Sequence, residues 1–285
     1  MTKKLSDKMR GMSERRKFSE EPWHQYYQNE LKAKYSPVVQ ILASKLQEGT
    51  KKRNPGVTRR FVWWDIENHS IVVSEAAHIM AKSSSDDLGA TVEEITAGAL
   101  LHDITKPQEI IFDDLKENTV AQRVMIQNLV TEGHARQEDL DVFNSNPNQG
   151  LSIFEATIHE KESKSLLREH GKTLFQFGNP RKILALSDSS GIPVIYLPKN
   201  DKGHHLHSLA QRIIFIADQL VQGTTIVNLK TRHQKARKRY NPQEIDALYE
   251  YAYRCADEIT KNIGLSSHEE LPSFIQAQIS TSHTS

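Results

Sequence analysis

Residues 97–107 read AGALLHDITKP, an apolar helical run that ends in a histidine and an aspartate. His102 and Asp103 carry two of the side-chain types that most often bind metal ions. Adjacent positions of a helix point about 100° apart, so the two side chains cannot both face a dry core. They can converge on a cation that lies between this helix and its neighbours. Such a cation needs further ligands from other parts of the chain.

Two further candidate ligands lie far away in the sequence. His69 belongs to WWDIENHSIVVSEAAHIM (63–80), and Asp218 belongs to LAQRIIFIADQL (209–220). The apolar residues of both segments recur at near-helical spacing, which predicts two amphipathic helices that these polar residues interrupt. Asp188, in ILALSDSSG, is an alternative late aspartate, but Asp218 has the better helical setting.

This arrangement resembles the HD-domain metal-dependent phosphohydrolases over roughly residues 60–222. LLHDITK (100–106) is similar to the family's usual LLHDxxK. The resemblance implies an all-α helical bundle in which Asp103 is a catalytic metal ligand and Lys106 helps to orient substrate phosphate. A buried histidine that is hydrogen-bonded to its neighbouring aspartate is the alternative, but it accounts for one helix only.

Two more histidines lie where a second metal ion would need ligands. His134 is in LVTEGHARQ and His159 is in EATIHEKES, and their spacing resembles the binuclear subset of the family, which includes the HD-GYP phosphodiesterases. The chain lacks that group's paired histidine and glycine-tyrosine-proline turn, which argues against cyclic di-GMP as substrate. Each histidine could instead be a surface or capping residue. The full ligand set that the resemblance implies is His69, His102, Asp103, His134, His159 and Asp218.

Other polar residues leave alternatives open. Asp65 lies one turn before His69 and could ligate a metal, orient the imidazole or be an exposed charge. His78 lies on the opposite side of the same predicted helix, so we expect a structural role. The loop histidines His204, His205 and His207 could contact substrate or metal, although solvated side chains are the expectation that we favour.

The ligand types predict the chemistry. Histidine nitrogen and carboxylate oxygen suit Mn, Fe, Mg, Zn or Ni, so the expected cofactor is a divalent metal ion, one or two per chain. Such an ion activates water and polarises phosphoryl oxygens. The resemblance therefore implies hydrolysis of a phosphoester or phosphoanhydride bond in a nucleotide or related small molecule. Two alternatives stay open: a catalytically silent HD-like signalling or scaffold module, and a protein that binds or cleaves nucleic acid through basic segments.

Length and composition agree with a soluble enzyme that has either one large core or a main domain with extensions. The chain has 285 residues, 37% of them hydrophobic, and no apolar run long enough for a signal sequence or a membrane span. We therefore expect a cytoplasmic protein with no membrane partner. Cys255 is the only cysteine, so we expect it to pack in the core without forming an internal disulfide bond. The sequence indicates no oligomeric state.

The net charge of +1 conceals an uneven distribution. Residues 1–60 contain 15 Lys or Arg and 6 Asp or Glu, and residues 230–239 contain six basic residues and no acidic ones. The rest of the chain carries a charge of −14. The basic segments could attract polyanions, but solvated surfaces that offset an acidic body are the interpretation that we favour.

These patterns divide the chain into three predicted parts. Residues 1–57 form a basic N-terminal extension with one helix from about Pro22 to Leu46. Residues 58–222 form the HD-like core, with an insertion at about 171–204 in which PVIYL predicts a small hairpin or lid. Residues 223–285 form a basic segment, a C-terminal helix and a polar tail that frays. Within the last two parts we expect helices at 59–82, 91–105, 119–133, 136–144, 151–169, 205–222 and 241–263.

Overall fold

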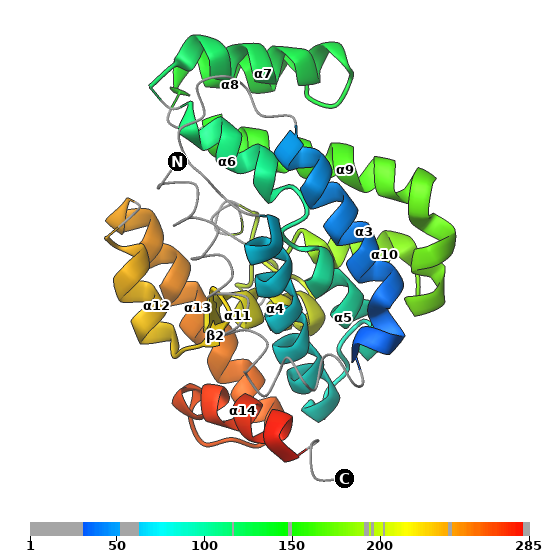
Figure 1. Cartoon of the computed structure of the whole chain (residues 1–285). Coiled ribbons are helices and arrows are strands. Elements are labelled where there is room, and N and C mark those ends of the chain that lie inside the picture. The colour runs from blue at the N-terminus through cyan, green and yellow to red at the C-terminus, as the bar shows by residue number, and fades with distance from the viewer. Residues whose placement is uncertain are drawn as a thin grey trace, which may run out of the picture.

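The computed structural model describes residues 31–51, 63–115, 117–147, 150–190, 194, 197–201, 203–238 and 241–281. These residues are almost entirely helical, apart from one small two-stranded sheet (Figure 1). The predicted all-α class is therefore confirmed. No helix in the described part of the chain combines the length and the apolar character that a bilayer-spanning segment requires.

In chain order the described helices are α3 (Lys32–Lys51), α4 (Trp63–Ser83), α5 (Val92–Leu101), α6 (Lys106–Asp114), α7 (Thr119–Thr131), α8 (Gln137–Ser145), α9 (Gly150–Leu174), α10 (Pro180–Ser187), α11 (Leu209–Leu220), α12 (Leu229–Ala236), α13 (Pro242–Ile263) and α14 (Leu271–Thr281). Short 3-10 helices lie at Phe175–Phe177 and His268–Glu270. The strands β1 (Val221–Gln222) and β2 (Thr225–Ile226) pair in antiparallel register directly after α11.

The main core forms around α4, α5 and α11. These helices pack on one another, while α3, α10 and α13 cover them from outside (Figure 1). Every residue of α11 except Gln211 is buried, which explains why most of its residues are apolar. Gly98 allows α5 and α10 to approach closely, because a Cβ at this position would lie 2.8 Å from the Cβ of Leu186. The core draws residues from all three parts that the sequence predicts.

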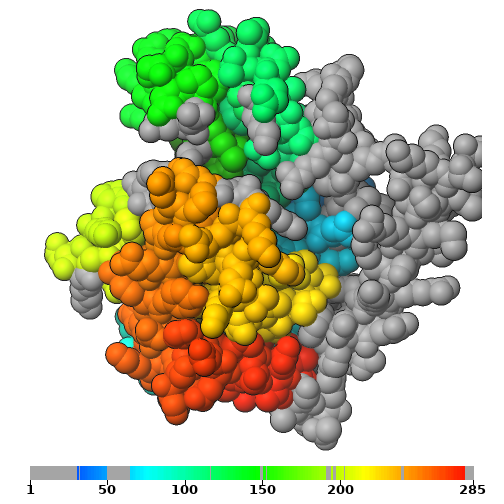
Figure 2. Space-filling model, turned by 90° about the vertical axis from the view of Figure 1, so that its left-hand side faces the viewer, coloured from blue at the N-terminus to red at the C-terminus, as the bar shows by residue number. Residues whose placement is uncertain are grey.

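A second, smaller core joins α7 and α8 to α6 and α9. It includes the stacked rings of Phe112 and Phe154, whose centroids lie 4.3 Å apart, together with Phe143. The α7–α8 pair forms a lobe above the main body in Figure 1. Figure 2 shows this lobe in green, separated by a hollow from the gold and orange helices α12 and α13.

The structure differs from the sequence-based expectation in two places near the centre of the chain. The helix expected at 91–105 ends at Leu101, and residues 102–105 form a turn before α6 begins. Pro107 explains this break, since proline fits the first turn of a helix but not its interior. No hairpin forms in the described part of residues 171–204, because α9 continues to Leu174 and Pro180 starts α10 after the Asn179 cap. Residues 191–193 and 195–196, which contain most of PVIYL, lie outside the described residues.

The chain ends also differ from the expectation. Residues 271–281 do not form a frayed tail, because Leu271, Ile275 and Ile279 recur every fourth residue and bury one face of α14 in the main core. The basic segment contains the helix α12, which we did not expect. At the other end, α3 covers the second half of the helix expected from Pro22, while residues 22–30 and the predicted start of the core at Thr58 lie outside the described residues.

Glu75 on α4 generates a prediction about stability. It is fully buried, and neither of its carboxyl oxygens has a hydrogen-bond partner among the described residues. Burial raises the pKa of this carboxyl well above its ordinary value. The folded chain therefore keeps a proton that the unfolded chain releases above about pH 4.3. Stability consequently falls as the pH rises from there toward the raised pKa.

We expect Glu75→Gln to raise the free energy of unfolding, relative to the native chain, more at pH 8 than at pH 4.5. The amide has no proton to lose, so the variant escapes the pH-dependent loss of stability. Urea unfolding of both proteins at both pH values, with a chelator present, measures the effect. An equal difference at the two pH values would contradict this account of Glu75.

Candidate metal centre and its cleft

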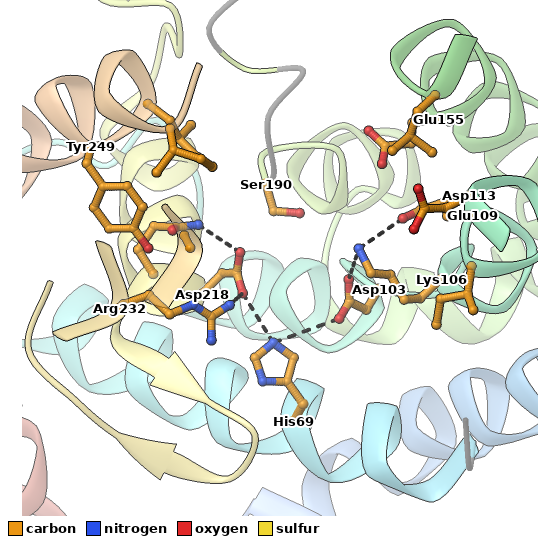
Figure 3. Close-up of a pocket in the computed structure, with 16 residues that line it drawn as sticks. His69, Asp103, Lys106, Glu109, Asp113, Glu155, Ser190, Asp218, Arg232 and Tyr249 are labelled. Atoms are coloured by element: carbon orange, nitrogen blue, oxygen red, sulfur yellow. Dashed lines mark hydrogen bonds and ion pairs between the residues drawn. The ribbon is translucent and has the colours of Figure 1, made fainter. Parts of the chain in front are cut away.

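Four of the predicted ligands meet at one place in the fold. His69 comes from α4, Asp103 follows the end of α5, and Asp218 comes from the last turn of α11 (Figure 3). His102 lies directly before Asp103, after the last residue of α5. The His69 Nε2 atom lies 3.1 Å from Asp218 Oδ1 and 3.8 Å from Asp103 Oδ2. The His102 Nε2 atom lies 3.6 Å from Asp103 Oδ2 and 3.9 Å from Asp218 Oδ1. Two imidazoles and two carboxylates therefore face a common point.

Backbone carbonyl groups set the orientation of both imidazoles. His102 Nδ1 donates to the Ala99 carbonyl oxygen at 2.7 Å, and His69 Nδ1 donates to that of Gly223 at 2.9 Å. A carbonyl oxygen only accepts, so each Nδ1 carries a hydrogen and each Nε2 of a neutral ring keeps its lone pair. Gly223 has a φ of 61° in the turn between β1 and β2, so this small hairpin serves to position His69.

The group fits a divalent metal ion. One donor atom from each of His69, His102 and Asp103 lies within 4.8 Å of the others. The His102 Nε2 atom is buried and has no hydrogen-bond partner in the described part of the chain. A buried lone pair that faces carboxylates is costly unless a cation satisfies it. A histidine whose other nitrogen donates to a carbonyl is also the usual form of a metal-binding imidazole.

The charges of His69 and Asp218 are coupled, because the ring Nε2 and Asp218 Oδ1 form a hydrogen bond of 3.1 Å. Burial alone would lower the pKa of His69, but the hydrogen bond to Asp218 and the charge of Asp103 raise it overall. Burial alone would raise the pKa of Asp218, but His69, His102 and Arg232 hold it well below its usual range. The carboxylate of Asp218 therefore stays ionised inside the protein, where it requires positive charge nearby.

His69, Asp103 and Asp218 form the floor of a cleft of about 280 Å³, whereas His102 lines a pocket that adjoins it. One wall comes from α6 and α9, and the opposite wall comes from α12 and α13 (Figure 3). The hollow in Figure 2 lies between the segments that carry these walls. The residues that line the cleft are His69, Asp103, Lys106, Glu109, Ile110, Asp113, Leu151, Glu155, Ser190, Asp218, Gln219, Arg232, Ala236, Ile245, Leu248 and Tyr249.

Two cations lie on opposite sides of the floor. The Lys106 Nζ atom lies 3.0 Å from Glu109 Oε2 and 3.9 Å from Asp103 Oδ1, and these charges, Glu109 foremost, hold the pKa of Lys106 well above its usual value. The Arg232 guanidinium lies 3.8 Å from Asp218 Oδ1 and donates to the Val221 carbonyl oxygen. The sequence predicted Lys106 as a residue that orients substrate phosphate, but it did not predict Arg232 at this site.

His159 lies in a pocket that adjoins the cleft rather than on its floor. Its Nδ1 atom lies 3.1 Å from Asp188 Oδ1, and its Nε2 atom lies 2.8 Å from Thr105 Oγ1 and 3.3 Å from Glu109 Oε1. Burial opposes a charge on this ring, but Asp188 and Glu109 raise the pKa of His159 to about 10. Both nitrogens therefore act as donors, and Asp188, the alternative late aspartate, pairs with His159 instead of joining the floor.

His134 does not join the other predicted ligands. It lies in the turn between α7 and α8, and it lines neither the cleft nor the adjoining pocket. His78 forms a hydrogen bond of 3.0 Å with Thr96 Oγ1 on α5, as expected of a structural residue, and Asp65 is exposed. The loop histidines His204, His205 and His207 also lie outside the cleft lining.

Sequence reasoning missed several cleft residues, of which Arg232, Glu109 and Glu155 matter most. Arg232 belongs to the basic segment 230–239, whose charges gave no sign that one of them turns inward. The lining residues of α6 recur at intervals of three and four, the spacing of one helix face. This spacing was present in the sequence, but it could be recognised only if a new helix was predicted to begin at Lys106.

Comparison of the chain with protein-family models, curated proteins and solved structures found no match. The resemblance to HD-domain phosphohydrolases thus rests on the sequence motifs, and the case for a metal centre rests on the geometry of this chain.

We expect the native protein to bind a divalent ion such as Mn²⁺ or Zn²⁺ at this centre, with a rise in melting temperature on loading. His102→Gln should weaken binding by about 100-fold or more, because it removes a donor atom that has no substitute nearby. His134→Gln is the matched control, since that histidine lies outside the group. Calorimetric titration measures the affinities. Loss of binding in the control variant, or full binding by His102→Gln, would contradict the assignment.

The charged His159 generates a second stability prediction. A raised pKa means that its contribution is fully present below the ordinary value of about 6.5 and disappears as the pH rises through about 10. The native chain should therefore lose stability relative to His159→Gln between pH 6.5 and pH 10. Urea unfolding of the two proteins at these pH values, with a chelator present, gives the difference. If the free energy of unfolding of the native chain minus that of His159→Gln is as large at pH 10 as at pH 6.5, the result would be inconsistent with an imidazolium at this position.

Proposed function

We propose that this protein is a metal-dependent phosphohydrolase that cleaves a phosphoester or phosphoanhydride bond in a nucleotide or a related small molecule. The observation that carries the proposal is the convergence of two Nε2 atoms and two carboxylates at the base of a cleft and of the pocket that adjoins it. Because both rings donate from Nδ1 to backbone carbonyls, each Nε2 of a neutral ring can give its lone pair to a cation, which would replace the proton that His69 shares with Asp218.

A divalent cation supplies Lewis acidity at such a site, because it polarises a phosphoryl oxygen and makes water more acidic. The chain itself supplies the orientation. Asp103 and Asp218 hold negative charge that fixes the cation, and their side chains are kept in place by Lys106 and by Gln219, whose Nε2 donates to Asp218 Oδ2 at 3.0 Å. The floor therefore needs little rearrangement when a substrate binds.

Lys106 and Arg232 suit the charge of a phosphoryl group. They flank the floor from opposite walls, so both can donate to oxygens of a phosphate that lies between them (Figure 3). Negative charge that develops on these oxygens during hydrolysis would be stabilised by both cations. Tyr249 lies beside Arg232 on the same wall, and burial raises the pKa of its phenol, so the ring stays neutral next to the guanidinium.

A panel assay tests the proposal. The native protein is incubated with Mn²⁺, Fe²⁺, Mg²⁺, Zn²⁺ or Ni²⁺ and with nitrophenyl phosphates, nucleotides, cyclic dinucleotides and short oligonucleotides. We expect metal-dependent phosphate or nucleoside release that Asp103→Asn reduces by about 1,000-fold and Arg232→Ala by about 100-fold. Lys238→Ala is the matched control for Arg232, because Lys238 is an exposed basic residue just beyond α12.

The outcomes separate the alternatives. Equal inactivity of the native protein and Asp103→Asn across the whole panel would overturn the proposal in favour of a binding or scaffold module. Activity restricted to oligonucleotides, with a steep dependence on salt and a large loss in Lys238→Ala, would instead indicate a nuclease that uses the basic segment.

A further inference from the structure

The two walls of the cleft differ in chemistry. The α12–α13 wall contributes Arg232 together with Ala236, Ile245, Leu248 and Tyr249. Apart from the guanidinium and a neutral phenol, this wall is apolar. The ring of Tyr249 is held rigidly, because it stacks on His233 with centroids 4.5 Å apart and planes 6° apart.

The α6–α9 wall is acidic. Glu109, Asp113 and Glu155 lie beside Lys106 on this side of the floor (Figure 3). Lys106 is paired with Glu109 at 3.0 Å, so its positive charge is already offset. Burial, together with the charge of Glu109, raises the pKa of Glu155 to about 7, and the side chain is consequently ionised at pH 8. The His159 imidazolium lies 3.3 Å from Glu109 behind this wall, but the three carboxylates still outnumber the two cations Lys106 and His159.

This contrast limits where a substrate can carry its phosphate groups. A phosphate on the floor has a cation on each side, and these are the two lysine or arginine side chains in the described lining. A second phosphate that extended toward α6 and α9 would meet carboxylates. A second phosphate that extended toward α13 would lose its water against Ile245 and Leu248, which offer no donor, and the single hydroxyl of Tyr249 would replace only part of that water.

We propose that the cleft selects a phosphate ester with a single phosphate and an uncharged organic group, and that the acidic α6–α9 wall excludes diphosphate and triphosphate chains. The organic group packs against α13, while the phosphate lies on the floor between Arg232 and Lys106. This inference rests on the proposed phosphohydrolase function and narrows its substrate class. Hydroxyl groups of a substrate can still approach the acidic wall, because carboxylates accept hydrogen bonds from them.

Three ligands that cannot be hydrolysed test this selectivity separately from catalysis. Phenylphosphonate has one phosphonate and an apolar ring, methylphosphonate lacks the ring, and methylenediphosphonate has two phosphonates. Binding to the Mn²⁺-loaded full-length protein is measured by calorimetry at pH 8 with the free Mn²⁺ concentration held constant. A bisphosphonate chelates metal ions more strongly than a monophosphonate, so any preference for phenylphosphonate must come from the cleft.

We expect phenylphosphonate to bind the native protein at least ~10-fold more tightly than methylenediphosphonate and at least ~3-fold more tightly than methylphosphonate. In the double variant Asp113→Asn/Glu155→Gln, phenylphosphonate should bind less than ~3-fold more tightly than methylenediphosphonate, because the variant removes two charges from the acidic wall. Glu160→Gln is the matched control, since Glu160 is an exposed residue of α9 that pairs with Lys164 at 2.7 Å. Melting temperatures of all variants report on their folding.

Each other result overturns the inference. Equal or tighter binding of methylenediphosphonate by the native protein removes the selectivity, and an unchanged ratio in the double variant removes the role of the acidic wall. Equal affinity for phenylphosphonate and methylphosphonate removes the apolar site on α13. If none of the three ligands binds, the inference fails even when the panel assay detects hydrolysis, so the two proposals can fail independently.

Discussion

The candidate site depends on two hydrogen bonds from imidazole to backbone. By donating from Nδ1 to the carbonyl oxygens of Ala99 and Gly223, His102 and His69 direct both Nε2 lone pairs toward Asp103 and Asp218. His69 Nε2 lies within hydrogen-bond distance of Asp218 when it carries a proton, whereas His102 Nε2 has no hydrogen-bond partner among the described residues and needs a cation to satisfy its lone pair. A ring with its hydrogen on Nδ1 can bind a metal ion through Nε2, whereas a ring with its hydrogen on Nε2 forms only a hydrogen bond to a carboxylate. The position of the hydrogen therefore distinguishes a metal centre from an ordinary buried pair.

The surrounding fold fixes the positions of these two carbonyl groups. Ala99 belongs to α5, whose close contact with α10 depends on Gly98, and Gly223 belongs to the turn that follows α11. Since α4, α5 and α11 form the centre of the main core, the four polar groups emerge from the most tightly packed helices of the molecule. The walls of the cleft come instead from α6, α9, α12 and α13, which surround that centre. A rigid floor with separate walls allows the walls to determine selectivity without disturbing the donor atoms.

The sequence was sufficient to predict the all-α class and the four residues that converge, because His69 and Asp218 interrupt periodic apolar helices and His102 and Asp103 directly follow one. It was not sufficient for His134 and His159, since spacing along the chain does not say which side of a turn a histidine occupies. In the structure, His159 turns toward Asp188 and Glu109, and His134 lies near the outer lobe. Arg232 was missed because a run of basic residues looks the same in sequence whether one member points inward or all are solvated. The break at Pro107 concealed α6, and with it the acidic wall.

Anomalous diffraction from crystals of the Zn²⁺- or Mn²⁺-loaded protein is the most direct test of the central claim. The account predicts a peak at about 2.0–2.2 Å from the Nε2 atoms of both His69 and His102, with carboxylate oxygens of Asp103 and Asp218 completing the contacts. A peak at another place in the molecule, or one bound through Nδ1 of either ring, would contradict the claim that the two backbone carbonyls prepare this site for a metal ion.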